Sequence, residues 1–401
     1  MKRYFTFTLA IIFVFLLQGC YSKGSSAPAP NNVNVVAGDG MVTVSWDMLP
    51  GVEYWIFKAA TNDVTPQTCL GAPQCQIIMK AVSPAVISGL TNGTLYSFSI
   101  NGRLDSGAGG PGSPSVQAIP RLAGATWSVG TPLGTGVMRG TAFGSVYVAV
   151  GDNGALFSST DGISWSGLTN PLPTANLNAV AYSDGKYLAV GSGGVILKST
   201  DAVIWQQQTS NTTNDLYAVA GNGLGGFVAT GAAGTIVTNI DGSNWTAAAS
   251  GTVDSLYGIT YANSKYIVVG ALGTMLSSAD TSTWQTIAPL TASSLKTVTY
   301  GYAAGATTGM FLALGDLGTL LTSSDGASWS LQNPLTSSQS INAVTYARQF
   351  IAADNNGNIY TSTDGITWTL ATTAASPLHA VTHGLYDYTA VGGSGLNMHA
   401  K

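Results

Sequence analysis

The chain has 401 residues, of which only 8% are charged. It contains 18 Asp and Glu residues and 14 Lys and Arg residues. This balance excludes the basic surface that a nucleic-acid-binding protein uses, and a hydrophobic content of 45% excludes a disordered chain. The 50 glycines, together with many Ser, Thr, Ala and Asn residues, favour short strands joined by tight turns. The composition therefore predicts a large all-β protein.

The first 20 residues have the features of a secretory signal. Lys2 and Arg3 precede an apolar run over residues 4–17, which is too short to span a bilayer comfortably. The following LQGC sequence resembles the lipobox of bacterial lipoproteins, which implies cleavage before Cys20 and lipidation of that residue. Tyr21 takes the place of the Asp that retains lipoproteins at the inner membrane. We therefore expect export and lipid anchoring to a bacterial cell envelope, at the outer membrane, without a spanning segment; an ordinary secretory signal is the alternative.

A small β-domain is expected next. Residues 21–30 are polar and contain proline, which predicts a flexible tether. Over residues 31–121 apolar and polar residues alternate between turn signals, as in MVTVSWD. Trp46 in the second strand, and Leu90 followed six residues later by Tyr96, resemble a fibronectin type III domain and its tyrosine corner. The resemblance implies a β-sandwich that acts as a spacer.

Two cysteines lie within this domain. Cys69 and Cys75 are six positions apart in a chain that we expect to be exported, and an oxidising compartment favours a local disulfide between them. The spacing is not that of a CxxC redox motif, and two ligands alone make a poor metal site.

Residues 122–401 consist of repeats of about 40 residues. A buried strand recurs seven times, from VYVAVG to DYTAVG, while a terminal D-x-x-x-W box recurs six times. The last repeat ends before its fourth strand, and the segment around Trp127 is a fourth strand with no repeat before it. The segment around Trp127 is therefore predicted to close the last blade of a seven-bladed β-propeller, which removes exposed sheet edges.

Each box places a small polar residue two positions before its Asp, which suits a tight turn whose Trp packs onto its own blade. The boxes resemble the Asp-box, or BNR, repeats of sialidases and photosystem II assembly factors, although they are one residue shorter. Because they lie in separate blades, we predict a structural role and no metal site. The box residues are Asp161 and Trp165, Asp201 and Trp205, Asp241 and Trp245, Asp280 and Trp284, Asp325 and Trp329, and Asp364 and Trp368.

The repeats lack the catalytic residues of a sialidase. They contain two arginines, Arg139 and Arg348, where a sialidase uses three, and no Glu, because the single Glu of the chain is Glu53. A glycosidase can use two Asp residues, but the Asp residues outside the boxes form no paired motif. We therefore predict no catalysis and no cofactor. An Asp-based glycoside hydrolase acting on surface polysaccharide is the alternative.

One position varies when the first strands of the repeats are aligned. It follows a large apolar residue and precedes a small one, and in a propeller it would surround one mouth of the central channel. Asp152, Asp316 and Asp354, between second and third strands, would lie nearby. The varied residues, a candidate ligand ring, are Arg139, Asn178, Tyr217, Tyr257, Lys296, Asn342 and His379.

These residues allow two interpretations. Aromatic and cationic groups around a concavity suit recognition of a polar ligand or a peptide. Alternatively, the mouth is polar because water fills it, and Arg139 and Lys296 simply pair with Asp152 and Asp316. The sequence therefore favours a non-catalytic envelope-binding or scaffold protein that recognises a protein or glycan, with a purely structural surface protein as a further alternative.

Overall fold

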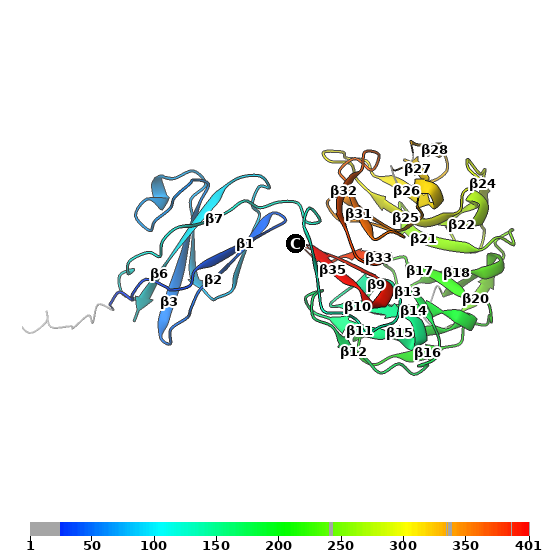
Figure 1. The fold of residues 1–401 in the computed structure, drawn as a ribbon, viewed down its shortest axis with the longest axis horizontal. Helices are drawn as coiled ribbons and strands as arrows, with labels where there is room; N and C mark the ends of the chain where they lie inside the picture. Colours follow the sequence, from blue (N-terminus) through cyan, green and yellow to red (C-terminus); the bar gives the residue numbers. More distant parts are fainter. Residues whose placement is uncertain (1–24, 240–243, 334, 336–338, 386, 401) are drawn as a thin grey trace, which may run out of the picture. The chain divides into compact units, whose positions relative to one another are not determined.

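The computed structural model describes residues 25–239, 244–333, 335, 339–385 and 387–400 (Figure 1). Within these ranges the regular elements are β-strands and short 3₁₀ turns, so the chain is all-β. It divides into two compact units, Met1–Arg121 and Leu122–Lys401. In the described ranges no helix is long and apolar enough to cross a membrane. Cys20 and the expected signal lie outside the described residues.

The first unit contains two antiparallel sheets. One consists of β1 (Asn34–Gly38), β2 (Met41–Ser45) and β5 (Ala85–Ser88), and the other of β4 (Gln76–Ala81), β3 (Val52–Ala59), β6 (Tyr96–Leu104) and β7 (Val116–Ala118), in these spatial orders. The alternating side chains of Val42, Val44 and Trp46 are buried in one core with residues of β3 and β6. Trp46 meets Tyr54 edge-on, with 5.6 Å between the ring centroids.

Hydrogen bonds of Tyr96 fix the segment that leads into β6. The hydroxyl of Tyr96 accepts a hydrogen bond from the backbone N–H of Thr91 (3.2 Å) and donates one to Gln74 (2.9 Å). The preceding Leu90 is buried. A buried Tyr tied to the backbone five residues upstream fixes the direction in which the chain enters β6.

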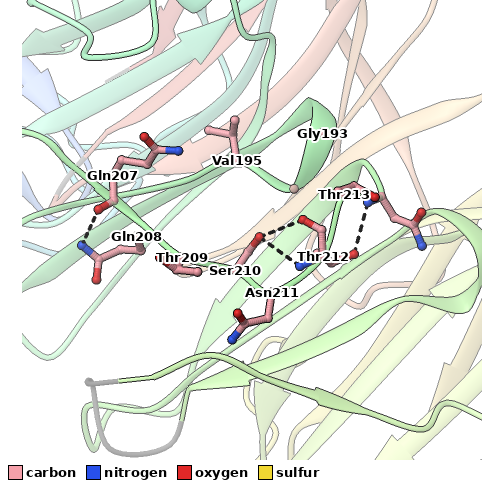
Figure 2. A pocket seen from close by; sticks show the side chains of 11 residues that line it. Gly193, Val195, Gln207, Gln208, Thr209, Ser210, Asn211, Thr212 and Thr213 are labelled. Atoms are coloured by element: carbon pink, nitrogen blue, oxygen red, sulfur yellow. Dashed lines mark hydrogen bonds between the residues drawn. The ribbon is translucent and has the colours of Figure 1, made fainter.

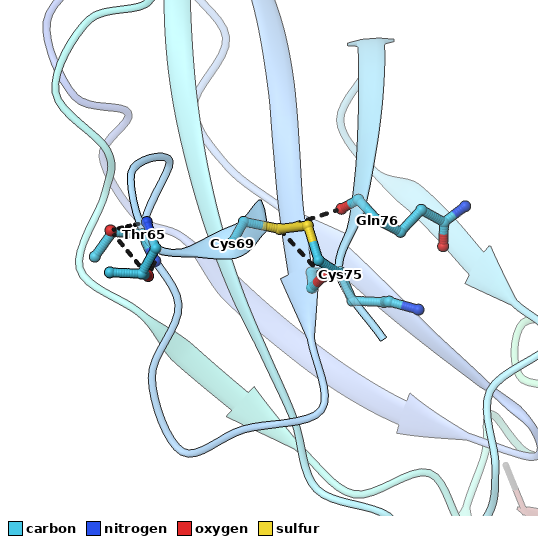
Figure 3. The surroundings of a disulfide bond; sticks show 6 residues. Thr65, Cys69, Cys75 and Gln76 are labelled. Carbon is cyan, nitrogen blue, oxygen red and sulfur yellow. Dashed lines mark hydrogen bonds between the residues drawn. A yellow bond between two sulfur atoms is a disulfide. The ribbon is translucent and has the colours of Figure 1, made fainter. Parts of the chain in front are cut away.

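A disulfide joins Cys69 to Cys75, with 5.4 Å between their Cα atoms (Figure 3). Cys69 begins the 3₁₀ turn η1 (Cys69–Gly71) and is buried. It packs with Phe57 and Val64 in a second, smaller apolar cluster, separate from the main core of this unit. The bridge thus closes a short loop over Phe57.

The segment before β1 is more ordered than the tether predicted for residues 21–30. The backbone of Ala27 donates to the carbonyl of Gly102, and Leu104 donates to the carbonyl of Ser25. Ala27 is buried. Residues 25–27 therefore lie along β6, where Ser26 forms an isolated bridge with Arg103, while residues 21–24 lie outside the described ranges.

Within its described residues the second unit contains seven four-stranded antiparallel sheets. The first three are β9 (Met138–Phe143), β10 (Tyr147–Gly151), β11 (Leu156–Ser159) and β12 (Ser166–Gly167); β13 (Leu177–Ser183), β14 (Lys186–Gly191), β15 (Ile196–Ser199) and β16 (Gln206–Gln208); and β17 (Leu216–Gly221), β18 (Phe227–Gly231), β19 (Ile236–Asn239) and β20 (Thr246–Ala248). The next three are β21 (Leu256–Ala262), β22 (Lys265–Gly270), β23 (Met275–Ser278) and β24 (Gln285–Ile287); β25 (Leu295–Gly301), β26 (Met310–Gly315), β27 (Leu320–Ser323) and β28 (Ser330–Leu331); and β29 (Ile341–Tyr346), β30 (Phe350–Asp354), β31 (Asn358–Ser362) and β32 (Thr369–Thr373). The seventh is β33 (Leu378–His383), β34 (Tyr388–Gly392), β35 (Asn397–Ala400) and β8 (Trp127–Val129).

The sheets are arranged around a closed ring. The first strand of each sheet lies beside the first strand of the next, and β33 lies beside β9, which closes the circle (Figure 1). Second strands such as β10 are buried along their whole length, because both of their faces meet a neighbouring sheet. This explains their unbroken apolar sequences, and it is the architecture of a β-propeller.

The seventh sheet takes its outer strand from the beginning of the unit. β8 pairs antiparallel with β35, and Trp127 lies opposite Ala400. The indole N–H of Trp127 donates to the carbonyl of Gly124 (2.8 Å). The fourth strand of the seventh sheet is thus β8, which precedes the first repeat in the chain.

Candidate functional site

The turns between third and fourth strands are tightly bonded structural units. In the turn at Asp161, the carboxylate accepts hydrogen bonds from the backbone N–H groups of Ile163 and Ser164, each at 2.8 Å, and from the hydroxyl of Ser159 at 2.9 Å. Trp165 packs against Tyr147 of its own sheet. The same carboxylate bonds occur at Asp201, Asp280, Asp325 and Asp364, while Asp241 lies outside the described residues.

These bonds also set the protonation state of the turns. The N–H groups of Ser328 and Ala327 lower the pKa of Asp325 to about 2, because hydrogen bonds to a carboxylate favour its charged form. The N–H of Thr283 and the hydroxyl of Ser282 do the same for Asp280, whose pKa is also about 2. Such carboxylates cannot serve as proton donors near neutral pH.

The candidate ring residues share a backbone feature that the sequence did not predict. In each of the seven first strands, the residue is skipped in the pairing with the second strand, so that two residues oppose one. For example, Leu256 pairs with Gly270 and Gly258 with Val269, leaving Tyr257 unpaired. A β-bulge re-aims a side chain and often occurs next to functional sites. All seven candidates therefore occupy the same special position.

An aromatic and cationic group lies on three adjacent sheets. The rings of Tyr217 and Tyr257 are 5.7 Å apart between centroids, and the ammonium of Lys296 lies 4.2 Å from the centroid of Tyr257. Lys296 also lies 4.0 Å from a carboxylate oxygen of Asp316. Burial, followed by the charge of Asp215, raises the pKa of Tyr217. The sequence placed these residues on one ring, and the structure adds their mutual contacts.

The opposite part of the ring is an ion pair beside a histidine. Arg139 donates to the carboxylate of Asp152 at the start of the 3₁₀ turn η2 (Asp152–Gly154). Burial lowers the pKa of His379, and the nearby positive charge of Arg139 lowers it further. His379 is therefore neutral near pH 7. The two ion pairs proposed from the sequence both occur, as the polar-mouth interpretation expects for the two cations.

The remaining two candidates serve to join neighbouring sheets. The amide of Asn178 donates to the carbonyl of Leu216 (2.8 Å), and that of Asn342 donates to the carbonyl of Leu378 (2.8 Å). Each bond reaches the first strand of the next sheet. Of the seven varied residues, Asn178 and Asn342 are thus explained by packing alone.

Asp354 does not join this group, contrary to expectation. Its carboxylate is fully buried and accepts hydrogen bonds from the backbone of Asn356 and Asn358 and from the hydroxyl of Tyr360. The turn after β30 differs from the 3₁₀ turns of the other six sheets, and Asp354 holds it together. A turn residue that faces inward cannot be distinguished from one that faces the channel by spacing alone.

A surface hollow that the sequence did not suggest lies on the second sheet (Figure 2). It has a volume of about 590 Å³ and is lined by residues 193–195 and 207–214. Apart from Val195 and two glycines, the lining residues carry amides and hydroxyls, and Ser210 bonds within the loop to Thr212. A similar hollow of about 650 Å³ lies at the corresponding place on the third sheet. Because no charged or imidazole side chain lines either hollow, neither offers an acid or a base to activate its hydroxyl groups.

Comparison with known proteins supports the fold. No protein-family model and no curated protein sequence matches the chain. Among solved structures, YCF48 from Cyanidioschyzon merolae matches with a TM-score of 0.55 and 18% identity, over 68% of this chain and 98% of that chain. The structure of YCF48 bound to D1 peptide matches with the same TM-score and identity, over 68% of this chain and 94% of that chain. A streptogramin B lyase structure matches with a TM-score of 0.61 and 11% identity, over 69% of this chain and 97% of the lyase.

These similarities establish a β-propeller and nothing finer. The WD40 propeller domain of Doa1 also matches, with a TM-score of 0.54 and 13% identity over 69% of this chain and 96% of that domain. A lyase and a peptide-bound protein thus share one architecture. The function must therefore be argued from the site and not from the fold.

Proposed function

We propose that the chain is an exported lipoprotein of a bacterial cell envelope, anchored through Cys20, whose second unit binds a partner protein without catalysis. The seven sheets are the blades of a seven-bladed propeller with Asp-box turns, and the first unit is a fibronectin type III spacer. The binding site is the channel mouth that the bulged residues surround. A glycan is the alternative ligand at the same mouth.

The residue types at the repeated bulge carry this proposal. A β-bulge locally disrupts the hydrogen-bond ladder and re-aims a side chain, and bulges are common next to functional sites. Here every innermost strand has one, and five of the seven bulged side chains are aromatic, cationic or imidazole groups. Tyr and Arg are the residues that most often dominate binding energy at protein interfaces. The match to YCF48 bound to D1 peptide supports a peptide or protein ligand.

The hydrolase alternative receives less support. A glycosidase acid needs a raised pKa, whereas the pKa values of the box carboxylates, such as Asp201 and Asp325, are lowered by their hydrogen bonds. At the mouth, Asp152 and Asp316 each lie beside a cation. This arrangement suits charge pairing better than proton donation.

Capture from envelope extract tests the proposal. The chain with both units is immobilised and compared with a variant carrying Arg139→Ala, Tyr217→Ala, Tyr257→Ala and Lys296→Ala. We expect the parent to retain a specific protein and the variant to lose about tenfold or more of it, because truncating central aromatic and cationic contacts removes most binding energy. Quantitative mass spectrometry of the captured proteins and glycans is the measurement.

A matched control uses the other end of the sheets. Ile204 and Leu224 are 66% and 83% exposed, in a box turn and in the hairpin between β17 and β18. The variant Ile204→Ala with Leu224→Ala should capture as the parent does. If all three proteins retain the same partners in equal amounts, the mouth is not a binding site, and a purely structural role gains support.

A further inference from the structure

Two leucines occupy a backbone conformation that leucine disfavours. The 3₁₀ turns η5 (Ala271–Gly273) and η6 (Asp316–Gly318) have left-handed middle residues, Leu272 at φ 54° and Leu317 at φ 58°. The corresponding residue is Asn153 in η2 and Gly193 in η3 (Ser192–Gly194), which are the types that tolerate this conformation, while the small residues Ala233 and Ser394 hold it in η4 (Ala232–Gly234) and η7 (Gly393–Gly395). Leu272 and Leu317 thus add strain where Gly or Asn would relieve it.

The side chains of the two leucines are mostly exposed rather than packed against the protein, so burial does not offset this backbone strain. Leu272 and Leu317 are each 65% exposed. A large apolar side chain that is both strained and exposed contributes little to folding, and residues held in sparsely populated conformations concentrate at functional sites. The contact that would explain these two leucines is therefore one with another molecule.

Both leucines lie next to the aromatic part of the mouth. Tyr257 is bulged opposite the end of β22, directly before η5. The turn η5 in turn lies against β25, which carries Lys296. Lys296 reaches both Tyr257 and Asp316, the first residue of η6. We call Tyr217, Tyr257, Leu272, Lys296 and Leu317 the mouth arc.

The charge around the mouth arc is negative. Asp215 and Asp254 lie directly before β17 and β21, and Asp316 begins η6, so the turns at this end of three adjacent sheets carry three carboxylates beside the ammonium of Lys296, which pairs with Asp316. Asp215 is near enough to Tyr217 to raise the pKa of its hydroxyl. Asp254 accepts a hydrogen bond from Thr274, just after η5. An excess of carboxylates attracts a cationic partner and repels an anionic one.

We propose that the mouth arc docks a short peptide segment of a partner protein that carries a basic side chain flanked by apolar ones. The apolar side chains would cover Leu272 and Leu317, and the basic one would lie by Asp215 and Asp254, within reach of the tyrosine faces. This proposal rests on the proposed function and names the ligand class. Exposed leucines offer a sugar chain few hydrogen bonds, so a peptide fits the arc better than a glycan.

A random dodecapeptide display library tests the ligand class. The chain with both units selects peptides, and each pool is counter-selected on the variant Leu272→Gly with Leu317→Gly. Glycine suits a left-handed residue, so this variant should unfold at the same temperature as the parent or higher, while the apolar contact is lost. We expect selected peptides rich in Arg or Lys beside apolar residues, and about tenfold or more weaker binding to the variant.

A second variant controls for general stickiness. Ile204→Ser with Leu224→Ser removes two exposed apolar side chains from the other end of the sheets and should bind the selected peptides as the parent does. Acidic or neutral peptides among the winners, equal binding to the Leu→Gly variant, or no selection at all would overturn the docking proposal. Capture that depends on Arg139 and Tyr257 but not on Leu272 and Leu317 would leave the proposed function intact and remove only this inference.

Discussion

At the residue scale, the Ser and Asp side chains of a described box turn bond to each other and to the backbone of the same turn. The serine hydroxyl of Ser323 accepts from the N–H of Gly326 and donates to Asp325, while Asp325 accepts from Ala327 and Ser328. A turn with a missing acceptor would leave backbone N–H groups without partners. The carboxylate therefore serves as the acceptor for the backbone N–H groups of its own turn, and it stabilises the turn most strongly when it is ionised.

This dependence predicts acid sensitivity. The folded pKa values of Asp280 and Asp325, about 2, lie below the ordinary value of 3.8, so their contribution is complete above about pH 4 and is lost as the pH falls toward 2. The variant Asp280→Asn with Asp325→Asn should be less stable than the parent at pH 7, and the difference should shrink between pH 4 and pH 2. Thermal unfolding followed by circular dichroism at several pH values measures this.

The control for this titration is Asp184→Asn. Asp184 also occupies a left-handed turn position, but its carboxylate is exposed and bonds only the side chain of Lys186 among the described contacts. An exposed ion pair contributes little, so this variant should follow the parent at every pH. A box variant whose stability deficit stays constant down to pH 2 would contradict the assigned role of ionised Asp.

At the element scale, the strands could be predicted from the sequence, while the ring contacts could not. Unbroken apolar runs such as VYVAVG marked second strands, because burial on both faces removes the need for alternation. The bulge at Tyr257 is a relation between two strands, and no pattern within one strand reveals it. The cation–π contact of Lys296 with Tyr257 joins different sheets, and the inward-facing Asp354 depends on how one turn bends.

The disulfide in the first unit permits a prediction about one loop. Replacing Cys69 with Ala and Cys75 with Ser opens a short loop over Phe57, which should lower the free energy of unfolding of the first unit by about 2 kcal/mol. The transition of the propeller should not change. Chemical denaturation followed by Tyr and Trp fluorescence measures the unfolding of the first unit and of the propeller. Single-unit fragments serve as references for assigning the two transitions.

Reduction of the parent protein supplies the matching control for the disulfide. Parent protein treated with a thiol reductant should lose the same stability as the Cys69→Ala, Cys75→Ser variant, and the variant should not respond to the reductant. A variant as stable as the oxidised parent would show that the loop over Phe57 holds without its bridge.

At the scale of the whole molecule, one strand pairing joins the two ends of the propeller chain, in addition to the contact of β33 with β9. β8 comes before the first sheet and β35 ends the last, and Ser128 lies opposite His399 across their ladder. The equivalent pair inside one blade is Lys198 opposite Gln206, where β15 and β16 follow each other in the chain. The two pairs occupy the same place in their sheets and differ only in how much chain lies between them.

Engineered disulfides at these two pairs compare the effect of fixing the ends of the propeller together with the effect of fixing two strands within one blade. Ser128→Cys with His399→Cys links residues across almost the whole propeller, while Lys198→Cys with Gln206→Cys closes a loop within one blade. Because the entropy that a cross-link removes from the unfolded chain grows with loop length, the first bridge should stabilise the propeller by about 3 kcal/mol more than the second. Denaturant midpoints of oxidised and reduced forms give the two differences. Equal gains from both bridges would mean that the pairing of β8 with β35 does not limit unfolding, and that the ring opens elsewhere first.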